Sequence, residues 1–123
     1  MLDALPMGVV VWQLADAADD TSLTLVGANT PAQRALARDF AAAVGKRILE
    51  AFPQTPAERI SVYASVARGG NARDLGPIQY SDELLASTTF SVRALPLPAE
   101  SVAVLIEDLS ERIERDEELR RLN

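Results

Sequence analysis

The sequence predicts an α+β fold, in which one five-stranded antiparallel sheet carries helices on one of its faces. Two observations support this class. Short runs rich in β-branched and aromatic residues stand near both ends of the chain, whereas the middle has helix-start signals and helical spacing of apolar residues. The predicted order is two strands, several helices, three strands and a last helix. A length of 123 residues fits one domain.

The first two predicted strands form a hairpin. The run MGVVVWQL, residues 7–14, is short and rich in β-branched residues, and it contains Trp12, the only tryptophan. In SLTLVGAN, residues 22–29, apolar and polar positions alternate as they do in a half-buried strand. The polar stretch between the two runs is typical of a turn.

Two segments in the middle carry the same helix-start signal. Thr30 is the predicted N-cap of the first helix, and Gln33 completes a capping box. Thr55 has the same predicted role in the second helix, which Gly69 ends because glycine tolerates a left-handed backbone. Between these helices, residues 43–53 predict a helical turn or two that ends at a proline.

Three more strands and a helix complete the predicted order. Residues 73–82 are irregular, and Pro77 favours an edge position because proline cannot donate to a neighbouring strand. The next two strands alternate clearly, with one side formed by Phe90, Val92, Ala94, Val102, Val104 and Ile106. From about Asp108 to the end, acid-before-base pairs four residues apart predict a helix that is stable in water.

Composition excludes several classes of function. The net charge is −6, and no basic cluster occurs outside the mixed-charge tail, so we expect no nucleic-acid partner. The apolar run at residues 7–12 is too short to span a bilayer, so we expect no membrane segment in this chain. The lack of cysteine fits a reducing compartment, and we expect a cytoplasmic location.

Catalysis by this chain is not expected. Without histidine or cysteine, the commonest general base, the commonest metal ligand and the catalytic thiol are all missing. No phosphate loop, nucleophile elbow or convergent pair of acids is present. We therefore predict no catalytic residue, no metal site and no enzyme activity in this chain.

Five stretches, in this order, resemble those of the PAS domain, a small sensory module of bacterial signalling proteins. They are LDALPMGVVVW (2–12), GAN with PAQRAL (27–36), VGKRILEAFP (44–53), FSVRALPLP (90–98) and IEDLSERIERDEEL (106–119). The last is similar to the family's terminal D-I-T-E-R motif, with Leu109 and Ser110 in place of Ile and Thr. The resemblance implies a PAS fold over residues 1–109, with a sheet that wraps over a pocket. It implies a C-terminal signalling helix over residues 110–123, the start of a connector to an effector.

The resemblance implies a module that relays the state of a ligand or partner through its last helix to an effector in the same longer chain. A histidine kinase is the favoured effector. The alternatives are a stress-response phosphatase, a cyclic-dinucleotide enzyme, or a PAS domain that dimerises and binds nothing. A stand-alone enzyme or carrier with an isomerase-like fold competes with all of these, but it would need an acid or base inside its pocket. The expected partners are a second copy of the chain and the effector domain in cis.

In PAS domains the pocket can hold haem, flavin, a carboxylate, a lipid or nothing. The absence of histidine argues against haem, whose iron such domains usually hold through that residue. The absence of cysteine excludes a covalent flavin photoadduct and a chromophore attached through a thioester. A small organic ligand and a non-covalently bound flavin both stay open.

Eleven residues are candidates for a role in the site or the relay. The candidate pocket residues are Trp12, Asn29, Tyr63, Tyr80 and Phe90. Core packing is the alternative for the aromatic residues, and a local hydrogen bond at the turn is the alternative for Asn29. The candidate relay residues are Asp108, Ser110 and Arg112, with Asp108 as the predicted cap of the last helix. The candidate interface residues are Arg93, Leu109 and Ile113. A lone arginine on a sheet face could bind a carboxylate ligand in bidentate fashion. Arg93 lies on the strand face opposite Phe90, however, so a solvated surface is favoured first, an interface second and a ligand contact last.

Overall fold

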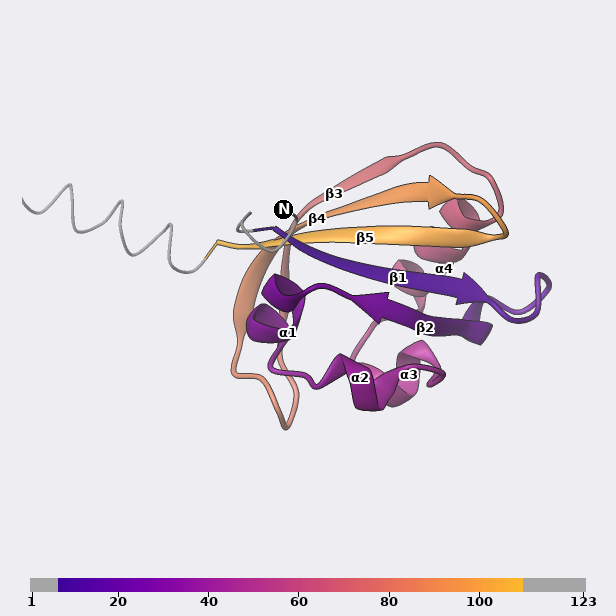
Figure 1. Ribbon diagram of the computed structural model, residues 1–123. Helices are drawn as coiled ribbons and strands as arrows, with labels where there is room; N and C mark the ends of the chain where they lie inside the picture. Colours follow the sequence, from indigo (N-terminus) through magenta and orange to yellow (C-terminus); the bar gives the residue numbers. More distant parts are fainter. Residues whose placement is uncertain (1–6, 110–123) are drawn as a thin grey trace, which may run out of the picture.

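The computed structural model describes residues 7–109 of the chain (Figure 1). The strands in this range are β1 (Gly8–Leu14), β2 (Leu23–Ala28), β3 (Arg73–Tyr80), β4 (Thr88–Leu97) and β5 (Ser101–Asp108). The helices are α1 (Thr30–Leu36), α2 (Phe40–Ala43), α3 (Ile48–Ala51) and α4 (Ala57–Ala67), with a short 3-10 turn at Asp20–Ser22. This order confirms the α+β class and the hairpin of the first two strands.

The strands form one antiparallel sheet in the order β2-β1-β5-β4-β3. The last strand, β5, lies in the centre and pairs with β1 on one side and β4 on the other. Strand β3 is an edge strand, as Pro77 predicted, because its missing N–H group costs no ladder hydrogen bond there. At the other edge, β2 carries a bulge opposite Val11 and Trp12 of β1.

Helices α1, α2, α3 and α4 pack on one face of the sheet, and the core lies between the two layers (Figure 1). The alternation predicted for the last two strands is confirmed, because Phe90, Val92 and Ala94 are buried while Arg93 is exposed. Residues of β1 and β5 continue the same buried face with Val10, Trp12, Leu14, Val102, Val104 and Ile106. None of the helices within residues 7–109 combines the length and the apolar composition that a bilayer crossing requires.

Both helix starts differ by one residue from the prediction. Asn29 is the N-cap of α1 in place of Thr30, because its extended backbone lets Oδ1 accept the N–H of Ala32 at 3.1 Å. At α4 the N-cap position belongs to Pro56, which has no side-chain acceptor. Thr55 instead donates its hydroxyl to the carbonyl of Phe52 at 2.8 Å. The predicted stop of α4 is confirmed, since Gly69 follows the helix with a φ of +96°.

Helix α1 lies directly on the sheet at Gly8. A Cβ atom at this position would stand 2.7 Å from Cγ1 of Ile106 and 2.8 Å from Cα of Ala32. Only glycine therefore allows the start of β1 to pass between β5 and the helix at this distance.

Candidate functional site: a cavity between sheet and helices

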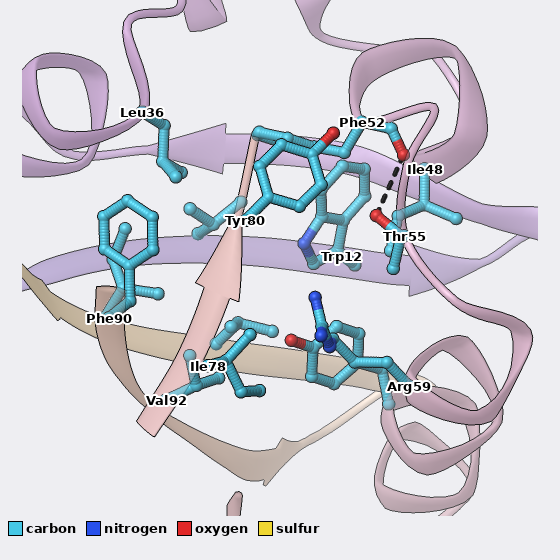
Figure 2. A pocket seen from close by; sticks show the side chains of 14 residues that line it. Trp12, Leu36, Ile48, Phe52, Thr55, Arg59, Ile78, Tyr80, Phe90 and Val92 are labelled. Carbon is cyan, nitrogen blue, oxygen red and sulfur yellow. Dashed lines mark hydrogen bonds between the residues drawn. The ribbon is translucent and has the colours of Figure 1, made fainter. Parts of the chain in front are cut away.

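A cavity of about 70 Å³ lies between the inner face of the sheet and the helices (Figure 2). Strands β1, β3, β4 and β5 form one side, and α1, α3, α4 and the segment between α3 and α4 form the other. The lining residues are Val10, Trp12, Leu36, Ile48, Phe52, Thr55, Arg59, Tyr63, Ile78, Tyr80, Phe90, Val92, Val104 and Ile106. The wall is largely apolar with a few polar groups, which is typical of a small-molecule site.

Of the residues in the described part of the chain that line the cavity, Arg59 is the one that carries a charge. It stands in the first part of α4 and is partly exposed. Figure 2 shows its guanidinium and the nitrogen-bearing edge of Trp12 turned toward the same part of the cavity. Among the described residues, no hydrogen-bond or ion-pair partner is found for this guanidinium.

Two buried side chains next to Arg59 carry polar atoms that have no partner within residues 7–109. They are the indole N–H of Trp12 and the hydroxyl of Tyr63, whose residues are 2% and 6% exposed. Burial raises the pKa of Tyr63 to about 12, and the nearby charge of Arg59 lowers it by less. The hydroxyl therefore keeps its proton at neutral pH and is available as a donor.

A second polar cluster, formed by Arg38, Tyr80 and Asp82, fixes one wall of the cavity. Arg38 and Asp82 form an ion pair whose side chains are 7% and 4% exposed. The hydroxyl of Tyr80 donates to Oδ2 of Asp82 at 2.7 Å. Arg38 also lies over the ring of Phe52, 4.6 Å from its centroid. Tyr80 and Phe52 both line the cavity, and their contacts with Asp82 and Arg38 hold their rings in position.

The same contacts shift two pKa values. Burial, and then the hydrogen bond to Asp82, raise the pKa of Tyr80 to about 12. Burial alone would raise the pKa of Asp82, but hydrogen bonds from Tyr80, the N–H of Leu84 and Arg38 outweigh it and hold that pKa below its usual value of 3.8. Asp82 is therefore ionised at neutral pH and keeps both its ion pair with Arg38 and its hydrogen bond from Tyr80.

Four of the five candidate pocket residues line the cavity: Trp12, Tyr63, Tyr80 and Phe90. Asn29 does not line it. Its side chain accepts the N–H of Val9 at 2.9 Å and donates to the carbonyl of Met7 at 3.2 Å, in addition to capping α1. Asn29 thus has the local role, joining the start of β1 to α1.

Three of the candidate relay and interface residues, Arg93, Asp108 and Leu109, lie within the described part of the chain, and none of these three lines the cavity. Arg93 is on the outer face of the sheet, with Nε 3.7 Å from Oδ2 of Asp74 on β3. Asp108 is the last residue of β5, opposite Phe90, and the N–H of Leu109 donates to the carbonyl of Thr89 at 2.9 Å. Ser110, Arg112, Ile113 and the predicted terminal helix lie outside the described residues.

Sequence reasoning missed Arg38, Phe52, Arg59 and Asp82. An arginine on a helix surface next to Glu58 has the pattern of a solvated face, so no local signal distinguishes Arg59. Arg38 and Asp82 are 44 residues apart, and neither stands in a recognisable motif. Within residues 7–109, no three histidine, cysteine or acidic side chains converge as a metal site requires.

Comparison of the sequence with protein-family models and with curated proteins finds no match. Comparison of the structure finds several similar folds. An RNA-binding Light-Oxygen-Voltage receptor gives a TM-score of 0.66 at 20% identity, over 98% of this chain and 34% of that one. A blue-light activated histidine kinase from Erythrobacter litoralis gives 0.64 at 14% identity, over 87% and 34%. The PAS domain of an HTR-like protein from Haloarcula marismortui gives 0.59 at 17% identity, over 86% and 89%.

The chain spans about a third of the length of the receptor and of the histidine kinase. It covers most of the isolated PAS domain. At these identities the likeness concerns the fold. The sheet, the helices on one face and the cavity between them therefore have the fold of PAS domains, as the resemblance of the five sequence stretches implied.

Proposed function

We propose that this chain is the sensory module of a longer signalling protein, in which a small organic ligand occupies the cavity and β5 relays its presence to residues 109–123. One observation carries the proposal. Val104 and Ile106 of β5 line the cavity, and the same strand ends at Asp108, directly before that last segment. A ligand would thus contact the strand that continues into the output, with Asp108, Ser110 and Arg112 as relay residues.

The size and wall of the cavity favour a small ligand over a flavin. Pockets for drug-sized ligands usually measure roughly 300–1,000 Å³. The cavity measures about 70 Å³, so a flavin would have to push its walls apart. Neither haem nor a covalent chromophore is proposed, and the chain itself is assigned no catalysis.

A histidine kinase is the proposed effector because the structural neighbours include one, although a phosphatase or cyclic-dinucleotide enzyme would fit the same relay. A cytoplasmic location is part of the proposal. We also propose a homodimer. Its motivation is the outer face of the sheet, where apolar side chains share a surface with Arg93: Val9, Val11, Val26, Leu95, Leu97, Ala103 and Leu105. Leu109 and Ile113 would extend this interface, or form it alone in a PAS domain that only dimerises.

Hydrogen exchange tests the relay. The 123-residue chain is incubated with one of three six-carbon probes, hexanamide, hexanoate or hexylamine, and amide exchange is followed by mass spectrometry. Binding of at least one probe should slow exchange in β5 and change it in residues 109–123. If no probe binds, or if a bound probe leaves exchange in both segments unchanged, the proposed function is wrong.

A further inference from the structure

Resting on the proposed function, we infer that the ligand is a small organic monoanion, a carboxylate with an apolar body, and that Arg59 binds its carboxylate. The proposal starts from the charge of the cavity wall. Within residues 7–109, Arg59 is the only charged side chain that lines the cavity, and no acidic group of this range lines it to neutralise the guanidinium. A cationic ligand would meet this charge unfavourably, whereas an anion would gain charge-assisted hydrogen bonds.

Two further hydrogen-bond donors are available to the carboxylate of the ligand. Among the described residues, every side-chain polar atom that is fully shielded from solvent has a hydrogen bond. The unpaired N–H of Trp12 and hydroxyl of Tyr63 must therefore border open space, and both residues line the cavity. An indole N–H can only donate, and the phenol remains protonated, so both suit an acceptor such as a carboxylate oxygen.

The other residues that line the cavity determine the chemical nature of the rest of the ligand, apart from its carboxylate. Phe90 and Val92 lie on the side of the cavity away from Arg59 (Figure 2), and Ile78 and Ile106 also line the cavity with side chains that offer no polar group. These residues suit an alkyl chain or a small ring. Because a single cation faces the space, a single negative charge is matched, and a phosphate dianion would keep one charge unpaired in an apolar site.

Trp12 provides the test, because the only tryptophan of the chain lies in the cavity wall. The full chain is titrated with hexanoate, hexanamide and hexylamine, and tryptophan fluorescence is recorded at pH 7.5 and fixed ionic strength. Hexanoate should bind saturably and about 10- to 100-fold more tightly than hexanamide, as expected for hydrogen bonds to a charged group. Hexylamine should bind more weakly than either.

The variants Arg59→Met and Arg34→Met test whether the preference for hexanoate over hexanamide depends on Arg59. Arg34 lies exposed on α1 and does not line the cavity, so its loss removes the same charge without touching the site. Arg59→Met should abolish the preference for hexanoate over hexanamide, whereas Arg34→Met should leave that preference unchanged. Circular dichroism checks that both variants fold.

Equal binding of acid and amide, a preference that survives Arg59→Met, or no saturable signal with hexanoate overturns the inference. A hexanamide that binds as well as hexanoate and still changes exchange in β5 would overturn only the ligand class. The proposed sensory function would then stand.

Discussion

Arg38 and Asp82 form a buried ion pair across 44 residues of sequence, joining the end of α1 to the loop after β3. The pair lies behind the cavity wall, where Asp82 accepts from Tyr80 and Arg38 covers Phe52. Taking two charges out of water is costly, so each needs the other once it is buried. The ion pair therefore holds the loop end of the β3–β4 hairpin against the helical layer.

Replacing one partner of this ion pair should lower the free energy of unfolding much more than replacing both partners. Arg38→Met leaves the Asp82 carboxylate buried without its cation and should lower the free energy of unfolding by about 3–5 kcal/mol. Adding Asp82→Asn to that variant should recover part of the loss. Urea unfolding of the single and double variants measures the coupling.

The exposed pair of Arg93 and Asp74 is the matched control for this cycle. Both side chains are more than half exposed, so Arg93→Met should change stability by no more than about 1 kcal/mol. Equal effects of Arg38→Met and Arg93→Met would contradict the role of the buried pair.

Tyr63 should make the protein sensitive to alkali. Its pKa is raised from 10.0 in the unfolded chain to about 12 in the fold, so the folded state keeps a proton that the unfolded state releases. The stabilisation is complete below pH 10 and is lost as the pH rises toward 12. It amounts to at most about 3 kcal/mol.

Urea unfolding between pH 8 and pH 12 checks this expectation, with Tyr63→Phe as the comparison. The variant should match the wild type near pH 8, because the hydroxyl has no protein partner among the described residues, and should lose less stability above pH 10. Some loss will persist, since the pKa of Tyr80 is also raised to about 12. Parallel pH profiles for the two proteins would refute the burial effect.

Gly8→Ala should destabilise the fold by about 1–3 kcal/mol, as overpacking of a core does. The new methyl group would overlap Ile106 and the backbone of Ala32, so α1 would have to move off the sheet. Gly27→Ala serves as the control, because a Cβ there meets no atom within 4 Å. The difference between the midpoints of chemical unfolding measures the cost, and similar midpoints would show that α1 adapts freely.

The proposed dimer predicts that Leu95→Asp weakens self-association by at least about tenfold, since a charge in the centre of an apolar interface must be desolvated. Leu95 is 37% exposed on the outer face of the sheet, beside Ala103. Leu84→Asp is the control, because this leucine is 66% exposed and follows β3 in a loop. Analytical ultracentrifugation of the full chain gives both dissociation constants. A Leu95→Asp protein that dimerises normally would place the interface elsewhere, for example at Leu109 and beyond.

Local patterns were sufficient for the sheet and for four of the residues that line the cavity: Trp12, Tyr63, Tyr80 and Phe90. Alternation predicted which side of β4 and β5 is buried, and large aromatic residues at inward positions, such as Trp12 and Phe90, then had to line any space left inside. The start of α1 differs by one residue from the prediction because Asn29 and Thr30 are both good caps, and only the backbone conformation decides between them.

The polar features of the site depend on contacts that no local pattern encodes. Arg38 and Asp82 meet only because β3 ends beside α3, and each alone has the pattern of a surface charge. Arg59 likewise looks solvated on its own helix. Its proposed role follows from the apolar residues and the indole N–H of Trp12 on the facing strands, together with the hydroxyl of Tyr63 on its own helix.

The central position of β5 also determines the stage of synthesis at which the sheet can be completed. During synthesis β1 and β2 can pair early and β3 and β4 later, but these two halves share no ladder until the last strand enters between them. The sheet is then completed by contacts of long sequence separation, such as Gly8 with Ile106, and such closures are slow. A nascent chain released before residue 101 would hold two hairpins with exposed edges, which is the kind of intermediate that aggregates.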